Sequence, residues 1–164
     1  MVPSLDTAPV FPDANGLTAL ITSGSLDTLL TDWFTAFARE THNPADRADQ
    51  AAAITDRLSY QGLTLWEANG EPVSLAGVSR QVAGMVRVAP VYTPPDRRGH
   101  GYASAVTAAV NQRALAAGAE EVVLYTDLAN PVSNSIYQRI GYRPVEDRVV
   151  LSFSAPRLAG RGDA

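Results

Sequence analysis

The sequence contains no cysteine and only two histidines, His42 and His100. Without cysteine the chain has no disulfide, no thiolate nucleophile and no cysteine-ligated metal. Two histidines are too few for a histidine-rich metal centre, so we expect no bound metal. Lysine is absent too: all 13 basic residues are arginines, a bias to which we assign no function.

Long apolar runs and an excess of positive charge are also absent. No apolar stretch approaches the about 18–20 residues of a membrane span. The N-terminus lacks the basic and then apolar regions of a signal peptide, so we expect a soluble, cytoplasmic protein without a membrane partner. The formal net charge of −4 argues against nucleic acid as a partner.

The chain is long enough for one domain with a substantial core. Its 164 residues are 46% hydrophobic and 18% charged, which is typical of a globular protein. The first residues are rich in proline, aspartate and alanine without periodicity, and the last ones in glycine, proline and arginine. We therefore place an irregular segment at residues 1–15, a single domain at residues 16–154 and a tail at residues 155–164.

The stretch from Val86 to Tyr102 is the most informative part of the sequence. Its β-branched residues predict a strand, which Pro94 and Pro95 end because proline has no N–H for a ladder. The segment Arg98–Ala103 is a glycine-rich turn that runs directly into alanine-rich helical sequence. Exposed amide groups at a helix N-terminus form an anion site, which best suits a phosphate or pyrophosphate.

The remaining patterns predict an α/β (α+β) fold with a mixed, largely antiparallel twisted sheet flanked by helices. Asn69-Gly70 predicts a tight hairpin, and Gly77 and Gly84 predict bulges or the close approach of a ligand. Around them the periodicity predicts a strand at Gly16–Ser23, a helix after a Ser25 cap, a helix from an Asn43 cap to Ser59, strands at Gly62–Ala68, Val73–Ser79 and Gln81–Thr93, a helix at Tyr102–Ala117, a buried parallel strand at Ala119–Thr126, a helix at Asn130–Ile140 and a last strand region at Tyr142–Ser154.

Two motifs together resemble the GNAT superfamily of N-acetyltransferases. Arg98-Gly99-His100-Gly101-Tyr102-Ala103 fits the acyl-CoA-binding pattern [Q/R]-x-x-G-x-[G/A]. The segment from Asn130 to Tyr142 is similar to the superfamily's second conserved segment, in which an asparagine opens a helix, a tyrosine follows seven residues later and a glycine–aromatic pair closes it. The resemblance covers Val73–Phe153 well, and the earlier part of the chain matches by the order of its elements.

The resemblance implies acetyl-CoA as a co-substrate. The amides of the loop are expected to bind its pyrophosphate, and the pantetheine arm is expected to lie as an extra strand along β-strand residues. Asn130 matches a position that contacts the pantetheine. The coenzyme-binding residues that follow from the resemblance are Val91, Tyr92, Thr93, Arg98, Gly99, His100, Gly101, Tyr102, Ala103 and Asn130.

The resemblance also implies Tyr137 as the general acid that returns a proton to the leaving thiolate. The general base is less determined. We place Asp127 first, because it follows the strand that ends near the expected thioester, and keep Glu67 and Glu40 as alternatives, acting directly or through water. Asp127 is alternatively a turn cap.

For three further residues the sequence leaves two possible roles open. His100 is either a solvent-facing loop residue or a group that neutralises phosphate. Arg97 is either a solvated charge or a contact to the 3′-phosphate of the coenzyme, and Asn134 is either a helix-surface residue or a ligand contact.

The sequence therefore predicts an acetyl-CoA-dependent N-acetyltransferase that acts on a primary amine of a small molecule or a peptide. The acidic net charge favours cationic acceptors such as polyamines or aminoglycoside-like compounds. The alternatives are a CoA-binding module without catalysis, and an acyltransferase with another acceptor or acyl chain. A homodimer is an open alternative to a monomer.

Overall fold

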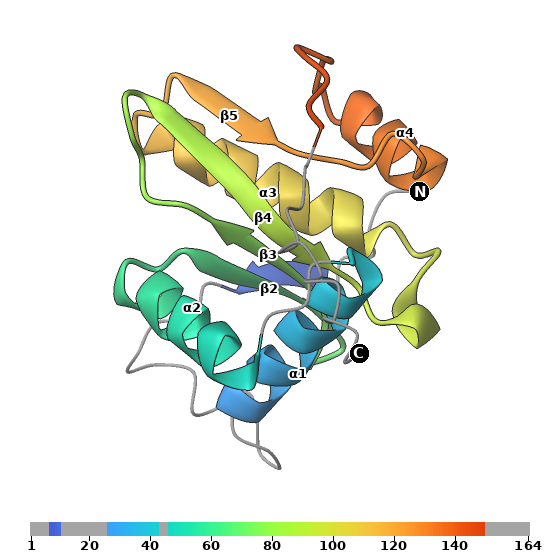
Figure 1. Ribbon diagram of the computed structural model, residues 1–164. Coiled ribbons are helices and arrows are strands. Elements are labelled where there is room, and N and C mark those ends of the chain that lie inside the picture. Colours follow the sequence, from blue (N-terminus) through green and yellow to red (C-terminus); the bar gives the residue numbers. More distant parts are fainter. Residues whose placement is uncertain (1–6, 11–25, 43–45, 150–164) are drawn as a thin grey trace, which may run out of the picture.

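The computed structural model describes residues 7–10, 26–42 and 46–149 (Figure 1). In these ranges the chain forms β1 (Thr7–Val10), α1 (Leu26–Glu40), α2 (Arg47–Ser59), β2 (Leu63–Ala68), β3 (Glu71–Val78), β4 (Met85–Tyr92), the 3-10 helix η2 (Pro95–Arg97), α3 (Tyr102–Ala116), β5 (Glu121–Leu124) and α4 (Pro131–Arg139).

The five described strands form one sheet in the order β1-β2-β3-β4-β5. The strands β1 to β4 pair antiparallel, and β5 pairs parallel with β4. Helix α3 connects the two parallel strands, which gives a β-α-β unit as the sequence predicted. The sheet is therefore mixed and largely antiparallel.

Helices α1 and α2 cover one face of the sheet (Figure 1). Leu30 and Phe34 of α1 and Ile54 of α2 pack against Leu63 and Leu65 of β2. The spacing of Leu30 and Phe34 places both on one side of α1, as the apolar periodicity of the sequence indicates. Full burial of a leucine stabilises the fold by about 1.5–3 kcal/mol, so this cluster holds both helices on the sheet.

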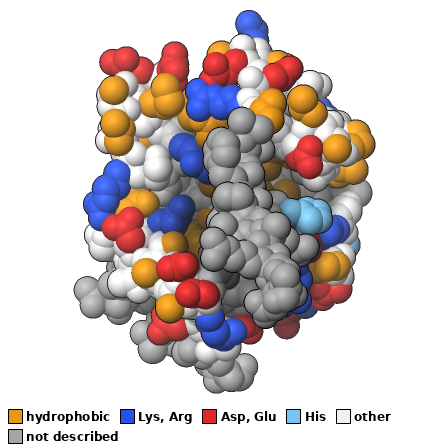
Figure 2. All heavy atoms as spheres, viewed as in Figure 1, with side chains coloured by type: hydrophobic (Ala, Val, Ile, Leu, Met, Phe, Trp, Pro, Cys, Tyr) orange, Lys and Arg blue, Asp and Glu red, His pale blue; other side chains and the backbone are white. Residues whose placement is uncertain are grey.

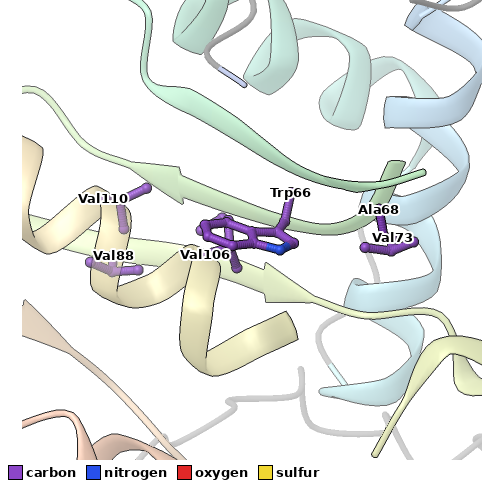
Figure 3. Close-up of a cluster of buried hydrophobic side chains, with 7 residues drawn as sticks. Trp66, Ala68, Val73, Val88, Val106 and Val110 are labelled. Carbon is purple, nitrogen blue, oxygen red and sulfur yellow. The ribbon is translucent and has the colours of Figure 1, made fainter. Parts of the chain in front are cut away.

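Helix α3 covers the opposite face. Val106 and Val110 of α3 pack with Trp66 of β2 and Val88 of β4 (Figure 3). The Trp66 ring lies between the strands and the helix in this view, and both valines are at most 3% exposed. This packing therefore fixes α3, and with it the N-terminus of the helix, relative to β4.

Two glycine predictions are confirmed. Asn69 and Gly70 form the turn between β2 and β3 with φ angles of 54° and 77°, which suits a mirror-image hairpin turn. The register of β3 and β4 shifts at Gly77, where an added Cβ would lie 2.7 Å from the Ala89 carbonyl oxygen. Only glycine allows this close approach of the two backbones.

Three local expectations are wrong. Residues Thr7–Val10 form an edge strand on β2 instead of irregular structure, and an edge tolerates the missing N–H of Pro9. Asp46, rather than Asn43, caps α2 through a 2.7 Å hydrogen bond to the Asp49 amide. Residues 142–149 form no strand, in keeping with Pro144.

Several expectations lie outside the described residues. They are the strand at Gly16–Ser23, the Ser25 cap, the end of the last strand region from 150 to 154, and the tail at 155–164.

Candidate active site

The parallel pairing of β4 with β5 ends halfway along β4. It begins with Met85 opposite Glu121 and ends with Val88 opposite Leu124, the last residue of β5. Strand β4 continues to Tyr92 (Figure 1), so the stretch from Ala89 to Tyr92 has no strand partner on the β5 side among the described residues. We call this stretch the open edge of β4. An extended ligand that carries amide groups can pair with such an edge as an extra strand.

The chain leads from the open edge into the glycine-rich turn. Gly99 and Gly101 have φ angles of 83° and 82°, which lie in the left-handed region that favours glycine. Gly101 is the N-cap of α3 and has no side chain to satisfy the first amides of the helix. An added Cβ at Gly99 would meet nothing within 4 Å, so the space beside the turn is open. The turn and the helix end together form a cradle for an anion.

His100 is fixed in this turn. Its Nδ1 lies 3.2 Å from the Arg97 carbonyl oxygen and 2.9 Å from that of Arg98, and its ring stacks on Tyr102 at a centroid distance of 5.4 Å. Because carbonyl oxygens only accept hydrogen bonds, Nδ1 is the donor. The neutral ring therefore presents an acceptor at Nε2, and only the protonated ring can donate to a phosphate from that atom.

The Arg98 side chain joins three elements. Its Nη2 atom donates to both carboxylate oxygens of Glu40 at 2.8 Å, and its Nε donates to the Thr93 carbonyl oxygen at 2.9 Å. The guanidinium also lies 6.0 Å from the centroid of the Tyr92 ring. These contacts connect the end of α1 with the end of β4, so the side chain fixes the position of the turn.

The end of β4 is held on both sides. The Ser74 hydroxyl of β3 donates to the Tyr92 carbonyl oxygen at 3.0 Å and lies 2.8 Å from the Thr93 hydroxyl. Tyr92 is buried, and the centroid of its ring lies 6.0 Å from that of Trp33 of α1. The role of Ser74 was not predicted from the sequence, although a small polar residue in a strand of larger apolar ones is a signal of such a contact.

The segment between β5 and α4 is held by hydrogen bonds within it. Asn130 caps α4 by accepting from the Ser133 amide at 3.1 Å, and the Asn134 side chain donates to the Asp127 carbonyl oxygen at 3.1 Å. The Asp127 carboxylate accepts from the Ala129 amide at 2.8 Å. The turn-cap interpretation thus describes the contact that Asp127 makes.

One tyrosine lies in the C-terminal half of α4, and a second follows the end of this helix. Tyr137 and Tyr142 meet edge to face at 5.9 Å, and the Tyr142 hydroxyl donates to Asn111 of α3 at 2.7 Å. Burial, above all, raises the pKa of Tyr142 to about 12. Burial also raises the pKa of Tyr137, whose hydroxyl has no hydrogen-bond partner in the described part of the chain. Tyr142 therefore anchors α4, and Tyr137 retains a protonated phenol that no described residue engages.

Glu67 is a buried carboxyl on β2. It follows a register shift between Trp66 and Glu67, is 9% exposed, and its Oε1 atom is buried without a hydrogen-bond partner among the described residues. Burial raises the pKa of this carboxyl above its usual range. Of the three base candidates, Glu40 pairs with Arg98 and Asp127 caps a turn, whereas Glu67 keeps an unpartnered oxygen.

Neither a cluster of metal ligands nor a membrane-spanning helix occurs among the described residues. They contain no group of three or more histidine, aspartate or glutamate side chains that could hold a metal ion. In the same part of the chain, none of the helices has the length and apolar character needed to cross a membrane.

A model of the acetyltransferase (GNAT) family matches residues 27–142 of the chain. A comparison with curated proteins finds no match.

Solved structures of acetyltransferases share the fold. A probable acetyltransferase is 16% identical with a TM-score of 0.62, and the match covers 81% of this chain and 97% of that one. AAC(6')-Iy, in complex with the bisubstrate analog CoA-S-monomethyl-acetylneamine, is 18% identical with a TM-score of 0.60 and coverages of 77% and 93%. A predicted acetyltransferase from Clostridium acetobutylicum with acetyl-CoA is 14% identical with a TM-score of 0.58 and coverages of 76% and 88%.

Proposed function

Because the chain belongs to the acetyltransferase (GNAT) family, we propose that it transfers the acetyl group of acetyl-CoA to a primary amine of a small molecule or a peptide. The observation that carries this proposal is the open edge of β4, which leads directly into the anion cradle at the start of α3. The similar structures with a CoA-linked bisubstrate analog and with acetyl-CoA support the choice of co-substrate.

The residues of the cradle suit a pyrophosphate. The amide groups from Gly99 to Ala103 donate to its oxygens, and the positive end of the α3 dipole adds about 0.3–1 kcal/mol for each favourable contact. Gly99 and Gly101 carry no Cβ, and the space beside Gly99 is open. In this proposal Arg98 contributes through its backbone and by holding the turn, because its guanidinium pairs with Glu40.

The open edge suits the pantetheine arm. The backbone groups of Val91, Tyr92 and Thr93 pair with its amides, and the side-chain amide nitrogen of Asn130 is a further donor. Bound acetyl-CoA supplies the activated acetyl thioester. The chain contributes by fixing that thioester beside the end of β5, which places the reacting carbon at one point of the sheet.

Tyr137 is the proposed general acid. A phenol has an ordinary pKa near 10, which is close to that of a thiol, and burial keeps this phenol protonated. Its hydroxyl has no competing partner among the described residues and can give its proton to the leaving sulfur. Tyr142 fixes the helix that carries Tyr137.

Glu67 is the proposed general base, ahead of Asp127 and Glu40. Its raised pKa brings a carboxylate closer to neutrality, where a base that deprotonates an amine works best. Glu67 pairs with Pro72, beyond the Leu75–Tyr92 pair, and so lies away from the end of β5; in this proposal the proton reaches it through water. Asp127 and Glu40 are already committed to Ala129 and Arg98.

The proposed function is tested by calorimetric titration with acetyl-CoA and by an assay of CoA release over a panel of primary amines. We expect binding of one acetyl-CoA per chain and release of CoA that depends on an amine. Binding without transfer to any acceptor would favour the non-catalytic CoA module. Absence of binding at millimolar acetyl-CoA would refute the proposed function.

A further inference from the structure

An open groove of about 620 Å³ lies between the C-terminal half of α2 and the turn that joins β3 to β4. Tyr60, the C-cap of α2, lies on one side, and Val82 and Met85 lie on the other. Val82 is 72% exposed and Met85 is 43% exposed, which is unusual for apolar side chains that share one groove. The groove thus offers apolar surface to a ligand.

Three arginines line the same groove, and two of them have no carboxylate partner among the described residues. Arg80 pairs with Asp56 at 2.9 Å. Arg57 donates only to the backbone oxygens of Ala53 and Ala89, and its Nε is buried without a hydrogen-bond partner. Arg87 makes a cation–π contact with Tyr125 at 4.9 Å and no described ion pair. The groove therefore has excess positive charge, in a protein whose net charge is −4.

Arginine side chains gather on this face of the molecule (Figure 2), where blue atoms surround the region between α2 and β4. Val88 faces α3, so its neighbour Arg87 faces the α1 and α2 side of the sheet. The charge of this groove thus differs in sign from that of the whole protein, and a ligand in the groove senses the local charge.

The groove begins where β4 and β5 separate. Arg87 directly precedes Val88, the last residue of β4 that pairs with β5, and Arg57 bonds the carbonyl oxygen of Ala89, the first residue of the open edge. With a rise of about 3.3 Å per strand residue, Arg87 and Ala89, which lies beside the end of β5, are about 7 Å apart along the strand. One acceptor molecule can therefore span the groove and the expected position of the thioester.

We propose that this groove binds an anionic group, a carboxylate or a phosphate, of the acceptor whose amine is acetylated at the open edge of β4. The inference rests on the proposed function and adds the class of acceptor to it. Arginine suits this role, because its guanidinium forms bidentate, charge-assisted hydrogen bonds with both groups. Val82 and Met85 contact the apolar part of the acceptor between its amine and its anion. A polycationic acceptor is disfavoured in this groove by Arg57 and Arg87.

The test compares an ω-amino carboxylic acid, the ω-aminoalkyl phosphate and the diamine of the same chain length. Their binding to the CoA-saturated protein is measured by calorimetry, and their kcat/KM is measured with acetyl-CoA. We expect at least one of the two anionic amines to bind, and to react, about tenfold better than the diamine, as one charge-assisted hydrogen bond provides. Comparison of the amino carboxylic acid with the aminoalkyl phosphate shows which of the two anions the groove prefers.

Arg87→Gln should remove most of this preference without changing the affinity for acetyl-CoA, and Arg87→Lys should retain part of it. Arg47→Gln is the matched control, because Arg47 is also an exposed arginine and its partner is Asp32, outside the groove. Equal or better use of the diamine, an unchanged preference in Arg87→Gln, or no binding of either anionic amine by a protein that binds acetyl-CoA would overturn the inference. Failure to bind acetyl-CoA would instead refute the proposed function, and the inference with it.

Discussion

One guanidinium nitrogen of Arg98 donates to both carboxylate oxygens of Glu40, each at 2.8 Å, across 58 residues of sequence. This ion pair connects the last turn of α1 with the turn that precedes α3. The same guanidinium also donates to the Thr93 carbonyl oxygen, directly after β4. The proposed phosphate cradle and the proposed strand for the pantetheine arm are thus held by one side chain, whose partner lies on a helix of the opposite face.

Glu40→Gln should loosen this connection. Both side chains are nearly half exposed, so solvent screens the pair, and we expect a loss of only about 0.5–1 kcal/mol in the free energy of unfolding. The affinity for acetyl-CoA should fall severalfold, because the turn is less fixed. Urea unfolding and calorimetry measure the two effects. Asp32→Asn, which breaks the more exposed pair with Arg47, is the control and should leave the affinity unchanged. An unchanged affinity in Glu40→Gln would show that Arg98 does not position the cradle.

Gly101→Asp should abolish acetyl-CoA binding, because its carboxylate would cap the amides that the pyrophosphate needs. Gly101→Asn keeps the size but removes the charge, so we expect a weaker loss. Gly118→Asp places the same residue at the opposite end of α3, also at a positive φ of 95° and with nothing within 4 Å of its Cβ. Calorimetry should find nearly unchanged affinity in this control. Equal losses at both ends would point to unfolding rather than to a phosphate site.

Tyr137→Phe should lower kcat by about 100-fold, the lower end of what a general acid contributes, and should spare the affinity for acetyl-CoA. Tyr142→Phe is the control: it loses the bond to Asn111 and about 1 kcal/mol of stability, but retains the proposed acid. Steady-state kinetics and thermal unfolding separate these effects. Undiminished turnover in Tyr137→Phe would remove the acid assignment.

The pH dependence gives a second test of Tyr137. Burial raises its pKa above the ordinary value of 10, so the phenol stays protonated throughout the neutral and mildly alkaline range. Titration of Tyr137 should therefore cause no loss of kcat below about pH 10. An alkaline loss centred near pH 8 that disappears in Tyr137→Phe would contradict this expectation.

Glu67→Gln should change both turnover and the pH dependence of stability. The pKa of Glu67 is raised in the folded state, so the folded protein binds the proton more tightly than the unfolded chain. The stability that this provides is present below the ordinary carboxyl pKa and is lost as the pH rises through the raised value. Relative to wild type, Glu67→Gln should thus gain stability with rising pH across this range. In wild type, kcat/KM should rise with pH as the general base loses its proton. This rise should be absent in Glu67→Gln and retained in Asp127→Asn. The opposite pattern would return the base role to Asp127.

The sequence predicted much of the fold because its strongest signals are local. The Asn69-Gly70 turn, the proline stop after β4 and the glycines around α3 each require a backbone conformation that few other residues adopt. The prediction failed at Thr7–Val10, because that strand forms by pairing with the edge of β2. Four residues are too few to show a periodicity that would predict it. It also failed for residues 142–149, where apolar residues suggested a strand.

The candidate site was predictable where it depends on motifs and not where it depends on long-range contacts. The glycine turn and the helix with Tyr137 could be located from the sequence alone. Three features could not be predicted, because they depend on elements that only the folded sheet brings together. They are the pairing of Arg98 with Glu40, the Glu67 oxygen without a described partner, and the groove that Arg57 and Arg87 both line.

Hydrogen–deuterium exchange with and without acetyl-CoA tests the central claim most directly, because it reports on the open edge of β4 and on the cradle separately. Saturating acetyl-CoA is predicted to slow exchange of the amides from Ala89 to Thr93 and from Gly99 to Ser104, and to leave the Gly118 end of α3 unchanged. Unchanged exchange in both segments at millimolar acetyl-CoA would contradict the account.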